Sequence, residues 1–283
     1  MIVGIDGSAG SAVALRWAVD HAEQLGDVKP VMAFAGGLYA YGFGAIEESD
    51  GSEGPYRSQA MMRLRTFLDE HAPSLVDAGE VIEDRPGAGL VDAARGSELL
   101  VVGTRGWSSR VDLSVGSVGA YCARHATVPV ALIPAEAPPI HDHLHVVVGF
   151  DGSRHARIAL RWTLTHLRRS AEVTAVRVFT SESMVGEPLS QSPEISEADA
   201  RRELEGGVAA VLTDLPAHPG VELLVVSGDP RAALRTASVD ADLLVVGSRG
   251  HGVLDRLLLG SVANALIHHP TIPTIVVPHP HEH

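Results

Sequence analysis

Two polar segments recur in this sequence with a spacing that suits the binding of a phosphate group. The first is Asp-Gly-Ser, at residues 6–8 and again at residues 151–153. The second is a pair of glycines separated by two residues, followed after nine further residues by Gly-Ser, at residues 103–117 and again at 247–261. Each segment follows a short apolar run typical of a buried strand. The chain therefore carries two copies of one candidate site.

Phosphate binding is the chemistry that the second segment favours. Glycines leave backbone N–H groups unobstructed and permit positive φ, so a loop can wrap closely around an anion. The helix that we expect to begin at each Gly-Ser adds unpaired N–H donors and the positive end of its dipole. The serine hydroxyls can donate to a phosphate oxygen, and Arg105 and Arg249 supply positive charge. Such local donors outweigh a net negative chain, because exposed charges beyond about 8 Å are largely screened at physiological salt.

Both segments also have a purely structural interpretation. Gly103 and Gly106 could turn the chain, and Gly116 with its serine could cap a helix. For Asp6 and Asp151 the structural interpretation is a cap on the following helix. The functional interpretation is a carboxylate that contacts ribose or adenine, or that holds a divalent metal beside the phosphates. Two copies at identical spacing beside a strand-ending aspartate favour the phosphate site.

The elements that must position these segments also repeat. Residues 2–8 (Ile-Val-Gly-Ile-Asp-Gly-Ser) correspond to residues 147–153, which lie 145 positions later. Residues 99–106 correspond to 243–250 at an offset of 144. The sequence therefore predicts two copies of one domain.

The domain boundaries follow from this repeat. We predict a first domain at residues 1–134 and a second at residues 146–283. The linker between them, residues 135–145, is rich in proline and histidine.

Strand and helix patterns alternate within each copy. In the first we expect strands at 2–5, 31–35, 81–82, 99–102 and 130–133. We expect helices at 12–25, 58–71, 90–97 and 116–125. This alternation predicts an α/β fold: a five-stranded parallel sheet in the order 3-2-1-4-5, with helices on both faces. Ligands bind such sheets where the strand order reverses, here between strands 1 and 4, which is where both polar segments begin.

Composition excludes several classes of protein. Hydrophobic residues make up 45% of the 283 and aromatic residues 4%, which suits a Val-, Leu-, Ile- and Ala-rich core. The formal charge of −13 argues against a nucleic-acid groove, and the single lysine argues against a polybasic membrane contact and a Gly-Lys-Ser/Thr phosphate loop. Cys122 is the only cysteine, so no intrachain disulfide can form. With no apolar run of membrane-spanning length and no signal-peptide pattern, we expect a cytoplasmic protein.

The last strand of each copy predicts an interface. Residues 130–133 and 274–277 are flanked by prolines and have the character of edge strands. Unpaired edges favour association, so we expect these strands to pair with each other, as an intrachain pseudo-dimer, or with another chain in a homodimer.

Asp-Gly-Ser after strand 1 and Gly-x2-Gly-x9-Gly-Ser after strand 4, present twice, closely resemble the universal stress protein family in its tandem-domain form. The resemblance covers nearly the whole chain and implies two Rossmann-like domains that each bind ATP through this motif. In the first copy it assigns Gly4, Asp6, Ala33, Gly103, Arg105, Gly106, Gly116, Ser117 and Val118 to the nucleotide. In the second it assigns Gly149, Asp151, Val178, Gly247, Arg249, Gly250, Gly260, Ser261 and Val262.

The function expected from this resemblance is an ATP-dependent regulatory or signalling module of the stress response, which acts on an unknown protein partner. We expect one ATP per domain with Mg²⁺ as its companion, no other metal site, and at most slow hydrolysis, because no general base can be assigned. One alternative is a nucleotide-free dimerisation or interaction scaffold of the same fold. Another is an enzyme that adenylates a substrate, which normally needs a further domain or a pyrophosphate-binding signature.

Overall fold

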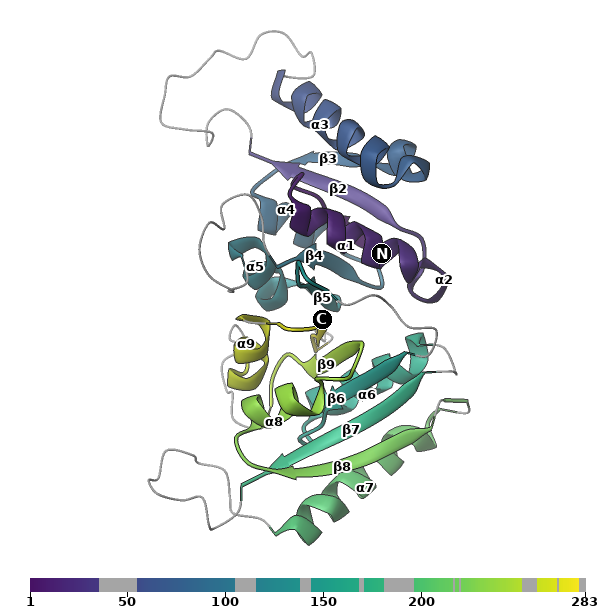
Figure 1. The fold of residues 1–283 in the computed structure, drawn as a ribbon, viewed down its shortest axis with the longest axis vertical. Helices are drawn as coiled ribbons and strands as arrows, with labels where there is room; N and C mark the ends of the chain where they lie inside the picture. The colour runs from purple at the N-terminus through teal and green to yellow at the C-terminus, as the bar shows by residue number, and fades with distance from the viewer. Residues whose placement is uncertain are drawn as a thin grey trace. The chain divides into compact units, whose positions relative to one another are not determined.

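The structure is a computed structural model that describes residues 1–35, 55–104, 116–137, 144–167, 171–180, 196–215, 217–218, 220–250, 259–268 and 270–279. The chain divides into two compact units, unit 1 (Met1–Glu136) and unit 2 (Ala137–His283). Within each unit, helices cover both faces of a parallel sheet (Figure 1).

Unit 1 contains the predicted five-stranded sheet. Its strands are β1 (Ile2–Gly4), β2 (Lys29–Phe34), β3 (Glu80–Glu83), β4 (Leu100–Gly103) and β5 (Val130–Ile133). They pair in parallel in the order β3-β2-β1-β4-β5. The predicted strand order is therefore confirmed, and β1 and β4 lie side by side at the point where the order reverses.

Unit 2 repeats this arrangement. Its strands are β6 (His145–Gly149), β7 (Glu172–Phe179), β8 (Val221–Ser227), β9 (Leu243–Gly247) and β10 (Thr274–Val277). The order β8-β7-β6-β9-β10 is the same, with β6 and β9 at the reversal. Strand β6 begins at His145, the last residue of the segment predicted as linker.

The helices of each unit form two layers. In unit 1 they are α1 (Ala9–Asp20), α2 (Ala22–Leu25), α3 (Pro55–His71), the short 3-10 helix η1 (Pro73–Ala78), α4 (Pro86–Ala93) and α5 (Ser117–His125). Helices α1 and α3 pack together over one face of the sheet, and α4 and α5 pack together over the other. Unit 2 has α6 (Arg154–His166), α7 (Glu197–Thr213), α8 (Pro230–Ala237) and α9 (Ser261–His268) in the corresponding places.

Two helices of unit 1 depart from the sequence-based expectation by more than three residues at one end or both. The helix predicted at 90–97 begins earlier, at Pro86, because proline is well suited to the first turn of a helix. The helix ends at Ala93, before Gly96, which has a φ of 78°. The helix predicted at 12–25 is interrupted at His21, whose backbone and ring both bond the carbonyl oxygen of Trp17.

The core of each unit is built from aliphatic side chains, as the composition predicts. Leu15 on α1 and Val101 on β4 are fully buried in unit 1, and Leu160 on α6 and Val245 on β9 hold the same places in unit 2. Strands buried on both faces therefore carry continuous apolar runs up to the glycine at their carboxyl end. Within the described ranges, no helix has the length and apolarity to span a bilayer.

Candidate functional site

The helices that start at the carboxyl edge of each sheet differ in how their first turns are capped. The hydroxyl of Ser8 accepts the N–H of Ser11 at the start of α1, and Ser153 accepts that of Ala156 at the start of α6. Helix α5 begins after Gly116, which has no side chain, and no described side chain caps it. First-turn amides lack partners within a helix, so those of α5 are left for another acceptor.

The two ends of the glycine motif are held together by the backbone in both units. The N–H of Gly116 donates to the carbonyl of Thr104 at 2.7 Å, and the N–H of Gly260 donates to that of Ser248 at 2.8 Å. Thr104 and Ser248 are themselves buried. The residue after the central strand and the start of the next helix are therefore held side by side in both units. We call this place the rim; it consists of Thr104, Gly116 and Ser117 in unit 1, and of Ser248–Gly250, Gly260 and Ser261 in unit 2.

The serine after each of these glycines is the first residue of its helix. Ser117 and Ser261 are both exposed, so their hydroxyls face solvent at the rim. Val118 and Val262 follow and are half-buried. The serines do not occupy the N-cap position, because Gly116 holds it in unit 1.

The aspartates after β1 and β6 shape their loops and do not cap the helices. The N–H of Ser8 donates to Oδ1 of Asp6 at 2.9 Å, and that of Ser153 donates to Oδ1 of Asp151 at 2.9 Å. The glycine between them has a φ of 82° in both units, a conformation that favours glycine. Because the serines are the caps, the helix-capping interpretation of the aspartates is wrong.

In unit 2 the two polar segments meet. A Cβ added at Gly250 would lie 2.5 Å from Oδ2 of Asp151, and one added at Gly260 would lie 3.1 Å from Cα of Arg249. Segments almost a hundred residues apart are thus in contact at the reversal of strand order. In unit 1, Arg105 and Gly106 lie outside the described residues, and so does the stretch that follows each second glycine.

Four of the predicted glycines make room for packing. A Cβ at Gly103 would lie 2.6 Å from the carbonyl oxygen of Gly10 on α1, and one at Gly247 would lie 2.8 Å from the backbone of His155 on α6. These two glycines let a helix approach the strand end closely. A Cβ at Gly4 would lie 2.8 Å from the side chain of Leu90 on α4, and one at Gly149 would lie 3.2 Å from that of Leu234 on α8. A contact of Gly4 and Gly149 with a ligand stays a prediction.

The predicted base-contacting residues occupy equivalent places. Ala33 pairs with Ile82 between β2 and β3, and Val178 pairs with Val226 between β7 and β8. Both are half-buried near the carboxyl ends of their strands. The repeat therefore extends to the second strand of each unit.

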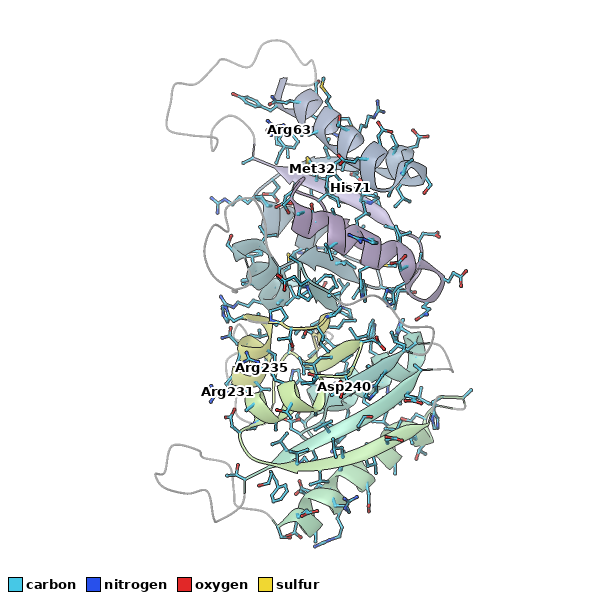
Figure 2. All side chains as sticks on the ribbon, in the orientation of Figure 1. Met32, Arg63, His71, Arg231, Arg235 and Asp240 are labelled. Carbon is cyan, nitrogen blue, oxygen red and sulfur yellow. The ribbon has the colours of Figure 1, made fainter. Side chains whose placement is uncertain are left out.

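Arg177 is a residue of this region that the sequence analysis missed. Its Nη1 donates to the backbone carbonyl of Asp151 at 2.6 Å and its Nη2 pairs with Glu203 at 2.8 Å. It therefore ties the Asp151 loop to β7 and α7. The strand register places Met32 of unit 1 at the position that Arg177 holds in unit 2, and Figure 2 labels Met32 on β2. A comparison of the two copies could have pointed to Arg177, because a buried strand carries arginine there in one copy and methionine in the other.

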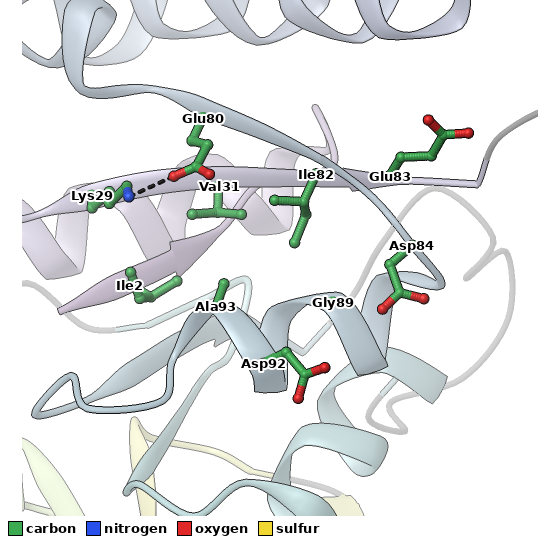
Figure 3. A pocket seen from close by; sticks show the side chains of 10 residues that line it. All are labelled: Ile2, Lys29, Val31, Glu80, Ile82, Glu83, Asp84, Gly89, Asp92 and Ala93. Carbon is green, nitrogen blue, oxygen red and sulfur yellow. Dashed lines mark ion pairs between the residues drawn. The ribbon is translucent and has the colours of Figure 1, made fainter.

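A separate cavity of about 380 Å³ lies in unit 1 between α4 and strands β1–β3 (Figure 3). None of the predicted site residues lines it. Its polar lining consists of Glu80, Glu83, Asp84 and Asp92 with Lys29, and Lys29 pairs with Glu80 at 2.5 Å. An excess of carboxylates repels phosphate, so this cavity does not compete as an anion site.

Comparison with known proteins places this architecture in a family. The sequence profile of the universal stress protein family matches residues 1–134 and 143–278. The chain belongs to the universal stress protein family. It does so as a tandem member, because the profile matches once in each repeat.

Its relatives share nearly the full length. A universal stress protein of Mycobacterium tuberculosis is 28% identical over 293 residues, which cover 98% of this chain and 96% of the relative. One from Mycolicibacterium smegmatis is 27% identical over 291 residues, covering 98% and 96%. The crystal structure of a universal stress protein from Archaeoglobus fulgidus covers 98% of this chain and 97% of its own, with a TM-score of 0.61 and 21% identity. This last likeness shows the shared fold.

Proposed function

We propose that each unit of this universal stress protein binds one ATP, accompanied by Mg²⁺, and that the chain acts as a nucleotide-dependent regulatory module. The observation that carries the proposal is the rim, where the N–H before the helix donates to the carbonyl of the residue after the central strand in both units. An uncapped helix start, an exposed serine and flanking glycines form the kind of cradle that phosphate groups need.

Each part of the cradle has a role in this proposal. The first-turn amides of α5 and α9 and the hydroxyls of Ser117 and Ser261 donate to phosphate oxygens. Arg249 adds positive charge beside the second rim. Asp151 and Asp6 accept hydrogen bonds from ribose hydroxyls, since their carboxylates stand at the ends of the first strands.

Bound Mg²⁺ neutralises part of the charge on the phosphate chain, and we assign it no protein ligand. Among the described residues, no group of three or more His, Cys, Asp or Glu side chains could hold a metal ion. Positioning without a general base supports at most slow hydrolysis.

Native mass spectrometry of the freshly purified full chain, followed by calorimetric titration with MgATP, tests the proposal. We expect retained nucleotide or binding heat with up to two sites per chain. The blocking variant Gly116→Trp should remove the unit 1 site, because among the described residues a Cβ there meets nothing closer than the Thr104 carbonyl oxygen at 3.5 Å and the ring would project into the rim. His125→Trp, on an exposed residue at the other end of α5, is the matched control.

Wild-type protein that neither retains nucleotide nor gives heat with MgATP would favour the scaffold of the same fold. Pairing through β5 and β10, within the chain or between chains, stays a prediction for either function. Light scattering of the purified chain measures whether a second copy is involved.

A further inference from the structure

Two histidines of unit 2 meet at the carboxyl edge of its sheet. His155 is the second residue of α6, and His279 follows β10 by two residues. Their ring centroids are 5.2 Å apart, with the ring planes inclined at 59°. Because α6 begins where β6 ends, the pair stands at the same edge as the glycine motif.

The position of His155 connects this pair to the rim. Its Cβ lies 2.8 Å from where a Cβ of Gly247 would stand, so the histidine lies beside the end of β9. Arg249 and Gly250 follow that strand end directly. Nε2 of His155 is buried and has no hydrogen-bond partner. A buried polar atom of this kind is costly to leave unsatisfied, and a ligand oxygen would satisfy it.

The charged groups around His155 favour the binding of an anion. Burial lowers the pKa of its imidazole, electrostatic interaction with His279, Arg249 and Arg154 lowers it further, and only Asp151 acts in the opposite direction. The ring is therefore neutral near pH 7. An anion among these groups would offset their positive charge and favour protonation of the ring.

Unit 1 has no such pair at the corresponding positions. The repeat places Gly10 opposite His155 and Ala135 opposite His279. The two units therefore offer the same backbone rim with different side chains beside it.

We propose that His155 and His279 extend the phosphate site of unit 2 and that His155 takes up a proton when a polyphosphate binds, whereas unit 1 binds without this uptake. The inference rests on the proposed function, since it requires that a phosphate chain occupies the rim. It makes unit 2 the site that responds to pH and to ligand charge.

Calorimetric titration of the full chain with MgATP, and separately with inorganic tripolyphosphate, tests this inference. Titrations in buffers of different ionisation enthalpy measure the protons taken up on binding. We expect uptake near pH 7, and an affinity that rises as pH falls from 8 to 6 by at most tenfold per pH unit for each proton. Protons released or bound by the ligand itself cancel when variants are compared.

The variants follow the repeat. His155→Gly installs the residue of unit 1, His155→Gln keeps a polar side chain in the helix, and His279→Ala removes the second ring. Each should lower the proton uptake and flatten the pH dependence of the affinity. His71→Ala, at the end of α3 (Figure 2), removes an exposed histidine elsewhere and should behave as wild type.

The outcomes separate the two proposals. Wild-type protein that binds MgATP without proton uptake, or histidine variants that titrate as wild type does, would overturn the inference and leave the proposed function standing. An absence of binding for both probes at every pH would overturn both.

Discussion

Gly250 lies directly against the carboxylate of Asp151, since a Cβ added at Gly250 would stand only 2.5 Å from Oδ2. The two residues belong to the two polar segments of unit 2, one after β6 and one after β9. Their contact explains why glycine suits the second position of the motif. Any side chain there would occupy the space that the carboxylate holds.

Gly250→Ala should therefore lower the affinity of unit 2 for MgATP while the chain stays folded. The new methyl group displaces the end of a short side chain and leaves the backbone in place. We expect a loss of roughly tenfold, since a hydrogen bond to a charged group contributes about 1.5 kcal/mol. Calorimetry measures the affinity, and circular dichroism checks the fold.

A double-mutant cycle identifies the cause of that loss. If alanine acts by displacing Asp151, then Gly250→Ala should add little in an Asp151→Ala background. Additive losses would show that Gly250 acts on the ligand independently of Asp151.

Gly116 and Gly260, which immediately precede helices α5 and α9, should differ in their tolerance of alanine. A Cβ at Gly260 would lie 3.1 Å from Cα of Arg249, whereas one at Gly116 would meet the carbonyl oxygen of Thr104 at 3.5 Å, an ordinary contact. Gly260→Ala should lower the free energy of unfolding by about 1 kcal/mol, and Gly116→Ala by less than about 0.5 kcal/mol. Urea denaturation of both variants measures the difference, and equal effects would contradict the described contacts.

Arg177→Met gives unit 2 the residue that unit 1 carries as Met32. The change removes the donor to the Asp151 carbonyl and the ion pair with Glu203, and Arg177 is only 15% exposed. We expect a loss of about 2 kcal/mol in the free energy of unfolding of unit 2, together with weaker nucleotide binding, because the Asp151 loop loses its anchor.

Arg161→Ala is the matched control for this arginine. Arg161 pairs with Asp214 at 2.7 Å, but both side chains are largely exposed, at 43% and 63%. Its removal should change the free energy of unfolding by no more than about 0.5 kcal/mol. If Arg161→Ala lowered the free energy of unfolding as much as Arg177→Met does, the contact of Arg177 with the Asp151 loop would be unimportant.

The thiol of Cys122 should be inert in the folded protein. Burial raises its pKa to about 12, and its Sγ donates a weak hydrogen bond to the carbonyl oxygen of Gly87 at 4.0 Å. Since only the thiolate reacts, alkylation by iodoacetamide at pH 8 should be very slow in buffer and fast in guanidinium chloride. Mass spectrometry follows the reaction, and rapid labelling of the native chain would mean that α5 opens readily.

Local patterns predicted the elements of the fold better than their limits. Strand β5 matches its predicted range of 130–133, because an apolar run between prolines leaves little freedom in its bounds. Helix α4 was placed too late because the prediction followed its apolar residues and overlooked Pro86 as a helix start. The break after α1 lies at His21, whose φ of −102° and ψ of 5° depart from the helical values, and apolar periodicity does not report backbone angles.

The sequence by itself determined the repeat, the order of the strands and the residues that could form a phosphate site, because these follow from self-comparison and from periodicity along the chain. Only the tertiary structure decided which of those residues face one another. It placed Gly4 against Leu90, joined Arg177 to the Asp151 loop and brought His155 beside His279. Such contacts join different layers and strand ends, so they depend on the register and packing of the whole sheet, which no short stretch of sequence encodes.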